Sequence, residues 1–365
     1  MRLVPIGGRT ADHRRAGRPV RGLASMTALV ASLLTVAACT GSSTSTATPT
    51  FSDTNNVIRV AETPGVGDAP LFIAFQQGLF RQAGLQVRIT NYANPQAELR
   101  DLQAGKVDVA FGDYADMFYA QARAQADNSK NGLNLVIVAD GYDAVSNTME
   151  VLALPPSPGS RGIVTPQNLV GKTVGTAPPA VMPNNVAGQP YSLDTVATQS
   201  VLTNNGVKPA SITWQSPPAY QNPQALIQAL ATHHVDAILA TEPAIFEAES
   251  QLGAVPVLDS CTGATSNLPL DGYFSSRTFA SAHHAKLAAF RSVLYRAQAL
   301  ANNQSQPVRT TLEGSEGMSV EDASLLTIGQ YPTTVSVNDL QRVISLMFSF
   351  NAIPTQPSVK AMIFR

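Results

Sequence analysis

The sequence predicts an α/β protein built as two similar lobes. Short β-branched or apolar runs alternate with stretches of helical apolar spacing, which is typical of strands joined by crossover helices and of parallel sheets covered on both faces. The alternation occurs twice, on either side of a Pro/Gly/Ser connector at residues 155–162. In addition, residues 102–112 (LQAGKVDVAFG) align with residues 230–240 (LATHHVDAILA), which suggests two similar halves.

The first half is expected between residues 57 and 139. Strands are predicted at residues 57–61, 85–89, 107–111 and 133–139. Helices are predicted at residues 71–82, 95–104 and 114–125. Pro70 suits the start of the first helix, and Gly84 suits its end.

The second half repeats this order and is followed by a helical tail. Strands are predicted at residues 172–175, 212–214 and 235–240, and helices at 193–204 and 223–231. Ser192 is a suitable N-cap for the helix at 193–204. Tail helices are predicted at residues 280–302, 319–329 and 336–350, and we expect them to pack on the first lobe.

The N-terminus carries an export signal. Six arginines precede an uncharged stretch at residues 23–38, and the stretch ends in Val-Ala-Ala before Cys39. This ending resembles the bacterial lipobox, which implies a signal peptide at 1–38 and lipidation of Cys39; an ordinary signal peptide with an incidental cysteine is the alternative. Residues 39–56 are then a lipid-anchored flexible tether, because this polar segment cannot bury a core. We therefore expect a protein anchored in the cell membrane at its extracytoplasmic face.

Composition argues against several classes of protein. Only 13% of the residues are charged, and the net charge is −1. Removal of residues 1–38 takes away six arginines and one aspartate, which leaves 18 basic and 24 acidic residues and a net charge of −6. Without a basic excess, nucleic acid is not an expected partner. Cys261 is the other cysteine, and we expect a buried thiol.

Catalytic motifs are absent or incomplete. Residues 65–70 (GVGDAP) lie between a strand and a helix, but the sixth position of this dinucleotide-like pattern is proline. Residues 171–173 (GKT) lack the earlier glycine of a phosphate loop, and neither S-x-x-K nor G-x-S-x-G occurs. The pairs at 233–234 and 283–284 are histidines without metal-ligand spacing. We therefore expect no catalytic residues, no cofactor and no metal.

Four motifs in fixed order point to a family. Residues 67–89 (GDAPLFIAFQQGLFRQAGLQVRI) resemble the opening of nitrate/sulfonate/taurine-type substrate-binding proteins of ABC transporters, a family that includes binders of thiamine pyrimidine precursors. Residues 102–114, 168–176 and 217–246 are similar to its second, third and fourth blocks. The chain departs from the pattern at residues 178–190, where a segment rich in Pro and Asn is inserted.

The resemblance implies a two-lobed periplasmic-binding-protein-like fold of type II, with the ligand cleft between the lobes. Lobe 1 would comprise residues 57–150 and 268–365, and lobe 2 residues 151–267. It also implies a monomer that captures a small organic nitrogen- or sulfur-containing solute by lobe closure and delivers it to an ABC transporter permease. The alternative is an enzyme on the same fold, such as a pyrimidine-precursor synthase.

Ligand-binding residues are expected in the loops at the carboxyl ends of the strands, because ligands of open α/β sheets bind there. The polar candidates are Asp68, Asp113, Tyr114, Asp140, Tyr142, Thr176, Ser192 and Glu242. The alternative for each polar group is that it caps a helix.

The charge of these loops bears on the ligand. They carry several carboxylates and neither lysine nor arginine, so a neutral or cationic, nitrogen-rich or aromatic ligand is favoured over a simple oxyanion. An anion held by helix N-termini remains the alternative.

Overall fold

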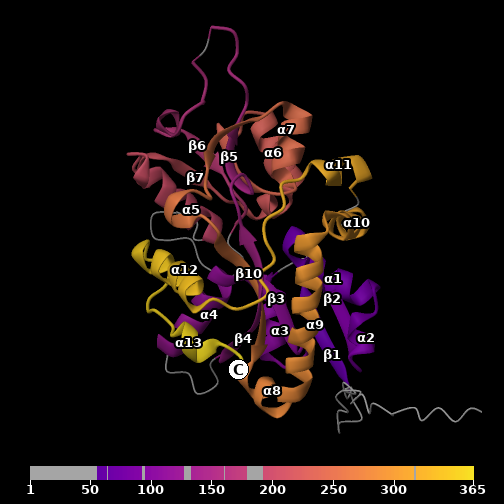
Figure 1. The fold of residues 1–365 in the computed structure, drawn as a ribbon. Coiled ribbons are helices and arrows are strands. Elements are labelled where there is room, and N and C mark those ends of the chain that lie inside the picture. The colour runs from indigo at the N-terminus through magenta and orange to yellow at the C-terminus, as the bar shows by residue number, and fades with distance from the viewer. Residues whose placement is uncertain are drawn as a thin grey trace, which may run out of the picture. The chain divides into compact units, whose positions relative to one another are not determined.

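A computed structural model of the chain contains two β-sheets, each with parallel and antiparallel strands and each at the centre of one α/β lobe (Figure 1). The structure describes residues 56–63, 65–92, 95–126, 133–159, 161–178, 192–315 and 318–365. The predicted signal peptide, Cys39, the tether before Asn56 and the insertion after Pro178 lie outside the described residues. Among the helices that are described, none combines the length and the apolar character required to cross a membrane.

The sheet of lobe 1 has five strands in the order β2-β1-β3-β10-β4. The strands are β1 (Val57–Glu62), β2 (Gln86–Asn91), β3 (Val109–Asp113), β4 (Leu135–Ala144) and β10 (Leu268–Ser276). Strand β1 is parallel to β2 and β3, whereas β10 is antiparallel to both β3 and β4.

The sheet of lobe 2 repeats this plan in the order β7-β6-β8-β5-β9. Its strands are β5 (Met149–Ala153), β6 (Thr173–Gly175), β7 (Thr213–Gln215), β8 (Ala237–Thr241) and β9 (Val255–Asp259). Strand β6 is parallel to β7 and β8, and β5 is antiparallel to β8 and β9. The prediction of wholly parallel sheets is therefore wrong. In each sheet the reversed strand is the one that enters from the other lobe, β10 in lobe 1 and β5 in lobe 2.

An aspartate placed just before a strand joins the strands of each sheet in the same way. The backbone N–H of Asp108 donates to the carbonyl of Arg59 at 2.8 Å, and its Oδ2 accepts from the Arg59 N–H, also at 2.8 Å. In lobe 2, the N–H of Asp236 donates to the Thr173 carbonyl at 2.8 Å, and its Oδ2 accepts from the Thr173 N–H at 2.8 Å. These matching contacts confirm that the two halves are structurally similar.

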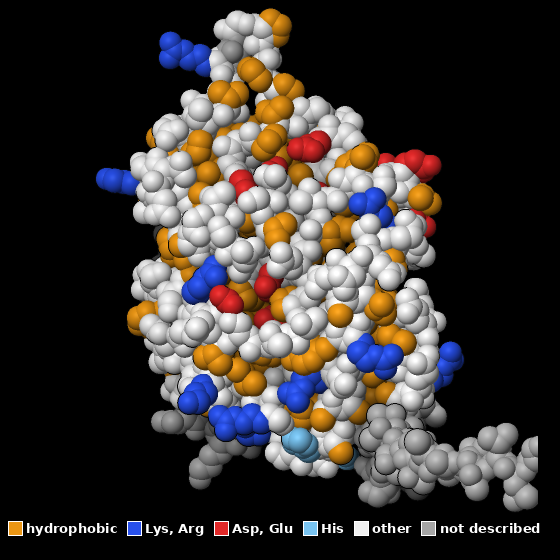
Figure 2. Space-filling model, in the orientation of Figure 1, with side chains coloured by type: hydrophobic (Ala, Val, Ile, Leu, Met, Phe, Trp, Pro, Cys, Tyr) orange, Lys and Arg blue, Asp and Glu red, His pale blue; other side chains and the backbone are white. Residues whose placement is uncertain are grey.

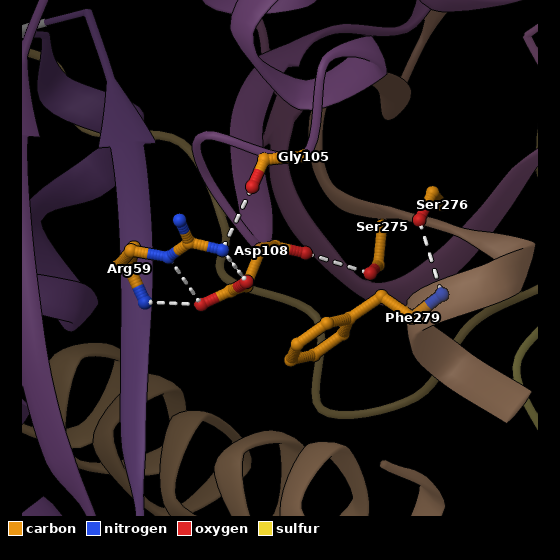
Figure 3. Close-up of polar contacts among 6 residues, drawn as sticks. All are labelled: Arg59, Gly105, Asp108, Ser275, Ser276 and Phe279. Atoms are coloured by element: carbon orange, nitrogen blue, oxygen red, sulfur yellow. Dashed lines mark hydrogen bonds and ion pairs between the residues drawn. The ribbon is translucent and has the colours of Figure 1, made fainter. Parts of the chain in front are cut away.

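The contact in lobe 1 is reinforced by an ion pair (Figure 3). The guanidinium of Arg59 donates from Nε to Asp108 Oδ2 at 3.0 Å and from Nη2 to the Gly105 carbonyl at 2.9 Å. On the other side, Ser275 of β10 donates from Oγ to the Asp108 carbonyl at 2.7 Å. Asp108 therefore connects three strands of the lobe 1 sheet, β1, β3 and β10.

Helices cover both sheets. Those of the first half are α1 (Ala69–Gln76), α2 (Leu79–Gln82), α3 (Pro95–Gln103) and α4 (Tyr114–Ala126). Those of lobe 2 are α5 (Leu193–Asn204), α6 (Pro223–Ala231) and α7 (Ala244–Leu252). The single helix predicted at 71–82 is divided into α1 and α2, because Gly78 adopts the left-handed conformation (φ 69°) and interrupts it.

The C-terminal tail packs mainly on lobe 1, as expected (Figure 1). Its helices are α8 (Arg277–Ala282), α9 (His284–Asn303), α10 (Ser305–Ser315), α11 (Val320–Leu325), α12 (Val337–Ser349) and α13 (Val359–Met362). Helix α9 packs against α1 and β4, and the buried rings of Phe290 and Phe80 stack with centroids 5.2 Å apart. Short 3-10 helices complete the described elements: η1 (Val66–Asp68), η2 (Pro166–Leu169), η3 (Pro209–Ser211), η4 (Pro218–Gln221) and η5 (Gly263–Thr265).

Candidate functional site

A cavity of about 600 Å³ lies between the two lobes at the strand ends. Lobe 1 contributes η1, the end of β3 and the residues Leu270 and Asp271 of β10. Lobe 2 contributes the end of β8 and the first turns of α5, α6 and α7. Ligands of open α/β sheets bind at this edge, and the volume is in the range of small-molecule sites. We therefore take this cavity as the candidate ligand site.

Three of the eight residues predicted for the site line this cavity. They are Asp113, Tyr142 and Glu242. Asp113 ends β3, and its Oδ1 accepts a hydrogen bond from the Ala115 N–H at 2.5 Å. This bond caps the start of α4. The capping role that was the alternative to ligand binding therefore applies to Oδ1 of Asp113. Burial, followed by the charges of neighbouring aspartates, raises the pKa of Asp113 well above its usual range.

Tyr142 and Glu242 line the cavity while they hold a segment of the tail. The hydroxyl of Tyr142 accepts a hydrogen bond from the Gly329 N–H at 2.7 Å. Glu242 Oε1 accepts from the Thr327 N–H at 3.0 Å, and its Oε2 accepts from the Phe246 N–H at 3.2 Å. Because Tyr142 belongs to lobe 1 and Glu242 to lobe 2, residues 327–331, which we name the strap, bridge the two lobes.

Other bonds fix the strap against lobe 1. Its residue Gln330 forms two backbone hydrogen bonds with Asp143, at 2.9 and 3.0 Å. The hydroxyl of Tyr331 donates to the Val66 carbonyl in η1 at 2.9 Å. The strap therefore contacts η1 directly, and η1 forms part of the cavity wall.

The other five predicted residues lie outside the lining. Tyr114 is fully buried, and its hydroxyl donates to Asp140 Oδ1 at 2.8 Å. Asp68 is buried at the start of α1, and Thr176 is buried after β6. Ser192 Oγ accepts from the Thr195 N–H at 3.3 Å and caps α5, as its predicted N-cap role requires.

Five further acidic residues, none of them predicted for the site from the sequence, line the cavity. Four lie in the first turns of helices: Glu98 in α3, Asp116 in α4, Asp194 in α5 and Glu247 in α7. The fifth, Asp271, lies in β10, which was not predicted as a strand. Three of these four helices were predicted from the sequence, and their N-termini follow strands of the sheets. The acids in their first turns could therefore have been predicted to lie at the strand ends where ligands bind.

The lining is strongly acidic. Seven of the described residues around the cavity are Asp or Glu, and none of them is Lys, Arg or His. Burial, followed by the charges of Asp194 and Asp140, raises the pKa of Asp271 to about 7. Burial raises the pKa of Asp194 to about 6. On the face shown in Figure 2, many of the Lys and Arg side chains gather over the α8 and α13 end, away from lobe 2.

Cys261, which follows β9 in lobe 2, is buried, as expected from the sequence. Its sulfur lies 3.7 Å from Thr148 Oγ1, and Thr148 lines the cavity. Burial raises the pKa of the thiol to about 12, so it is not a thiolate at neutral pH.

Comparisons with known proteins agree with this architecture. The sequence profile of the NMT1/THI5-like family matches residues 67–307. No curated protein sequence matches the chain. The fold is similar to that of the periplasmic aliphatic sulphonate binding protein SsuA from Escherichia coli, with a TM-score of 0.64 and 17% identity over 84% of this chain and 97% of that one.

Two further solved structures share the fold. The alkanesulfonate-binding protein SsuA from Xanthomonas axonopodis pv. citri, bound to MOPS, has a TM-score of 0.63 and 18% identity over 85% of this chain and 98% of that one. The periplasmic nitrate-binding protein NrtA from Synechocystis PCC 6803 has a TM-score of 0.62 and 12% identity over 84% of this chain and 85% of that one.

Proposed function

Because the chain belongs to the NMT1/THI5-like family, we propose that it is the extracytoplasmic solute-binding protein of an ABC importer. In this proposal it captures a small organic nitrogen- or sulfur-containing solute in the cavity and delivers it to a permease. The observation that carries the proposal is the cavity of about 600 Å³ between two similar lobes, at the sheet edge where such folds bind ligands. The sulfonate- and nitrate-binding proteins with the same fold support it.

Closure of the lobes on the solute would be the mechanism of capture. A ligand drives closure only if it binds the closed arrangement more tightly than the open one. Both lobes contribute polar side chains to the cavity wall, so a solute could contact more of these side chains when the lobes are closed than when they are open. Asp194 and Glu247 come from lobe 2, and Asp113 and Asp271 come from lobe 1.

Among the described hydrogen bonds, the strap is attached to lobe 2 through one carboxylate, that of Glu242. Glu242 accepts the Thr327 N–H, whereas the strap contacts lobe 1 at Tyr142, Asp143 and Val66. We infer that the strap moves with lobe 1 and that the bond to Glu242 changes when the lobes close.

The lobe boundaries and the membrane anchor belong to the same proposal. We propose that lobe 1 comprises residues 57–150 and 268–365 and lobe 2 residues 151–267. The start of β10 at Leu268 supports the second limit, whereas β5 (Met149–Ala153), a strand of the lobe 2 sheet, crosses the first limit by two residues. We propose that Cys39 carries the lipid and holds the protein, as a monomer, at the outer face of the membrane.

An enzyme on the same fold is the alternative. The described lining residues include no Ser, Cys, His or Lys, so the Ser–His and Cys–His pairs of nucleophile and base are absent from the described wall. The acids with raised pKa are the feature that favours the alternative, because perturbed carboxyl groups also act as general acids.

Two measurements test the proposal. A thermal-shift screen with taurine, ethanesulfonate, nitrate, 4-aminopyrimidine and 1,4-diaminobutane should find a stabilising solute, since ligand at 100 times its Kd adds about 2.7 kcal/mol to stability. Small-angle scattering should then give a smaller radius of gyration with that solute. An unchanged radius at saturation would contradict capture by closure. Mass spectrometry of the recovered solute separates a binder, which returns it intact, from an enzyme.

A further inference from the structure

The acidic residues of the cavity come from both lobes. Glu98, Asp113, Asp116 and Asp271 belong to lobe 1, and Asp194, Glu242 and Glu247 belong to lobe 2. No described residue of the lining carries a positive charge. No described side chain of the wall therefore neutralises these charges when water is excluded from the cavity.

One of these carboxylates is fully buried and incompletely bonded. Glu98 has 0% exposure and lines the cavity from the first turn of α3. Its Oε2 accepts a hydrogen bond from the Thr63 hydroxyl at 3.3 Å. Its Oε1 has no hydrogen-bond partner among the residues that the structure describes. A buried carboxylate oxygen without a donor is costly, and burial raises the pKa of Glu98 well above its usual range. A ligand N–H that reaches this oxygen would stabilise the ionised form of the side chain.

The carboxylates of the two lobes also repel each other across the cavity. The charge of Asp194 in lobe 2 contributes to the raised pKa of both Asp113 and Asp271 in lobe 1. Closure would bring these groups closer together and remove the water between them, which strengthens the repulsion. A ligand that carries positive charge to both sides would relieve this repulsion and favour closure.

We propose that the cargo is a small organic dication, a solute with a positively charged, N–H-bearing group at each end, one held by the carboxylates of each lobe. The inference rests on the proposed function, because it names the class of solute. Ammonium and amidinium groups donate charge-assisted hydrogen bonds to carboxylates. The apolar lining residues Phe111, Leu270 and Val66 provide contacts for a carbon chain between the two ends.

An inorganic cation is a poorer match for the same wall. No group of three or more His, Cys, Asp or Glu among the described residues has an arrangement that could hold a metal ion. Two of the carboxylates already accept backbone N–H groups, Asp113 from Ala115 and Glu242 from Thr327 and Phe246. A spread of acids around a cavity suits a ligand with separated charges better than a single compact ion.

Calorimetric titration of the protein in the form that the cell produces after processing tests the class of cargo. The probes are 1,4-diaminobutane and 1,5-diaminopentane as dications, 1-aminobutane as the matched monocation, ethanesulfonate and nitrate as anions, and calcium and zinc as metal ions. We expect a diamine to bind at least tenfold more tightly than 1-aminobutane, because the monocation loses the charge-assisted bonds to one lobe.

Several results would overturn the inference. They are tighter binding of an anion than of either diamine, equal affinity for 1-aminobutane and the diamines, binding of a metal ion alone, and no heat from either diamine. An anion that binds and closes the lobes would leave the proposed function intact while removing the inference. Failure of every probe to bind would count against both.

A matched pair of variants assigns the effect to the cavity. Glu247 and Glu249 lie on the same helix, but only Glu247 lines the cavity, and Glu249 is exposed. The variants Glu247→Gln and Asp271→Asn should weaken binding of the better diamine at least tenfold, the loss expected for one hydrogen bond to a charged group. Glu249→Gln should change it less than twofold. Equal effects of Glu247→Gln and Glu249→Gln would refute the assignment, provided that melting curves show both variants to be folded.

Discussion

Replacing Asp271 by asparagine removes one negative charge from the cavity with almost no change of shape. Asp271 lies in β10 and is partly exposed in the cavity wall. Its pKa is raised from the ordinary 3.8 to about 7, first by burial and then by the charges of Asp194 and Asp140. The ionised side chain therefore opposes folding, and the neutral amide should not.

The size of this effect depends on pH, and its sign follows from proton binding. With a raised pKa, the folded protein binds a proton between about pH 4 and pH 7 that the unfolded chain has released, so stability falls as the pH rises through this range. At 1.36 kcal/mol for each pH unit, the rise from 3.8 to about 7 corresponds to about 4 kcal/mol at most. Since Asp271 is partly exposed, water in the cavity screens the charge, and we expect about 1–2 kcal/mol above pH 7.

Urea and thermal denaturation without ligand test this reasoning. At pH 8, Asp271→Asn should be more stable than the parent chain by about 1–2 kcal/mol, or roughly 2–4 °C in Tm. The gain should shrink at pH 5 and disappear below pH 4. The exposed control Glu249→Gln should show no such trend. A gain as large at pH 4 as at pH 8, or a loss of stability at pH 8, would refute the electrostatic account.

Three further substitutions test other parts of the structure. Asp108→Asn should lower the free energy of unfolding in urea by about 2 kcal/mol, because the buried partner of Arg59 is lost. Asp236→Asn should lower it by about half as much, since the pair of Asp236 with Lys172, at 3.4 Å, is more exposed. Equal losses for the two variants would contradict this comparison. Tyr142→Phe removes the acceptor of the Gly329 N–H, so exchange of that amide should accelerate about tenfold, and an unchanged rate would show that the strap does not depend on this bond. Cys39→Ser should release the protein from membrane fractions or block its processing, and unchanged membrane association would exclude the lipid anchor.

Much of the fold could be predicted because its helices and parallel strands have strong local signals. The predicted helices at 193–204 and 223–231 coincide with α5 and α6. Two of the three strands that were missed, β9 and β10 but not β5, have weak signals. Strand β9 contains Pro256, and β10 contains Pro269 and Gly272, all of which are residues that favour loops. Their strand conformation is determined by pairing with distant segments of the sheet.

The site could be predicted less well because a strand end gives the place of a residue but not the direction of its side chain. Asp113 and Tyr114 are neighbours, yet Asp113 lines the cavity and the Tyr114 ring packs against Phe118 and Phe274 in the core. Asp271 was beyond prediction for another reason. It reaches the cavity only because β10 returns antiparallel between β3 and β4, and this pairing has no local signal.

The cavity acids link the stability of the empty protein to the chemistry of its cargo. Carboxylates that gather without a positive partner lower stability, so their presence in one place requires a compensating function. If that function is to hold a dication, one substitution should act in opposite directions: Asp271→Asn should stabilise the empty protein at pH 8 and weaken the binding of a diamine. A residue with a purely structural role would not produce this pair of effects. Weaker diamine binding without a gain in stability would mean that Asp271 contacts the cargo but does not destabilise the empty protein. A gain in stability without weaker diamine binding would exclude Asp271 from the ligand site.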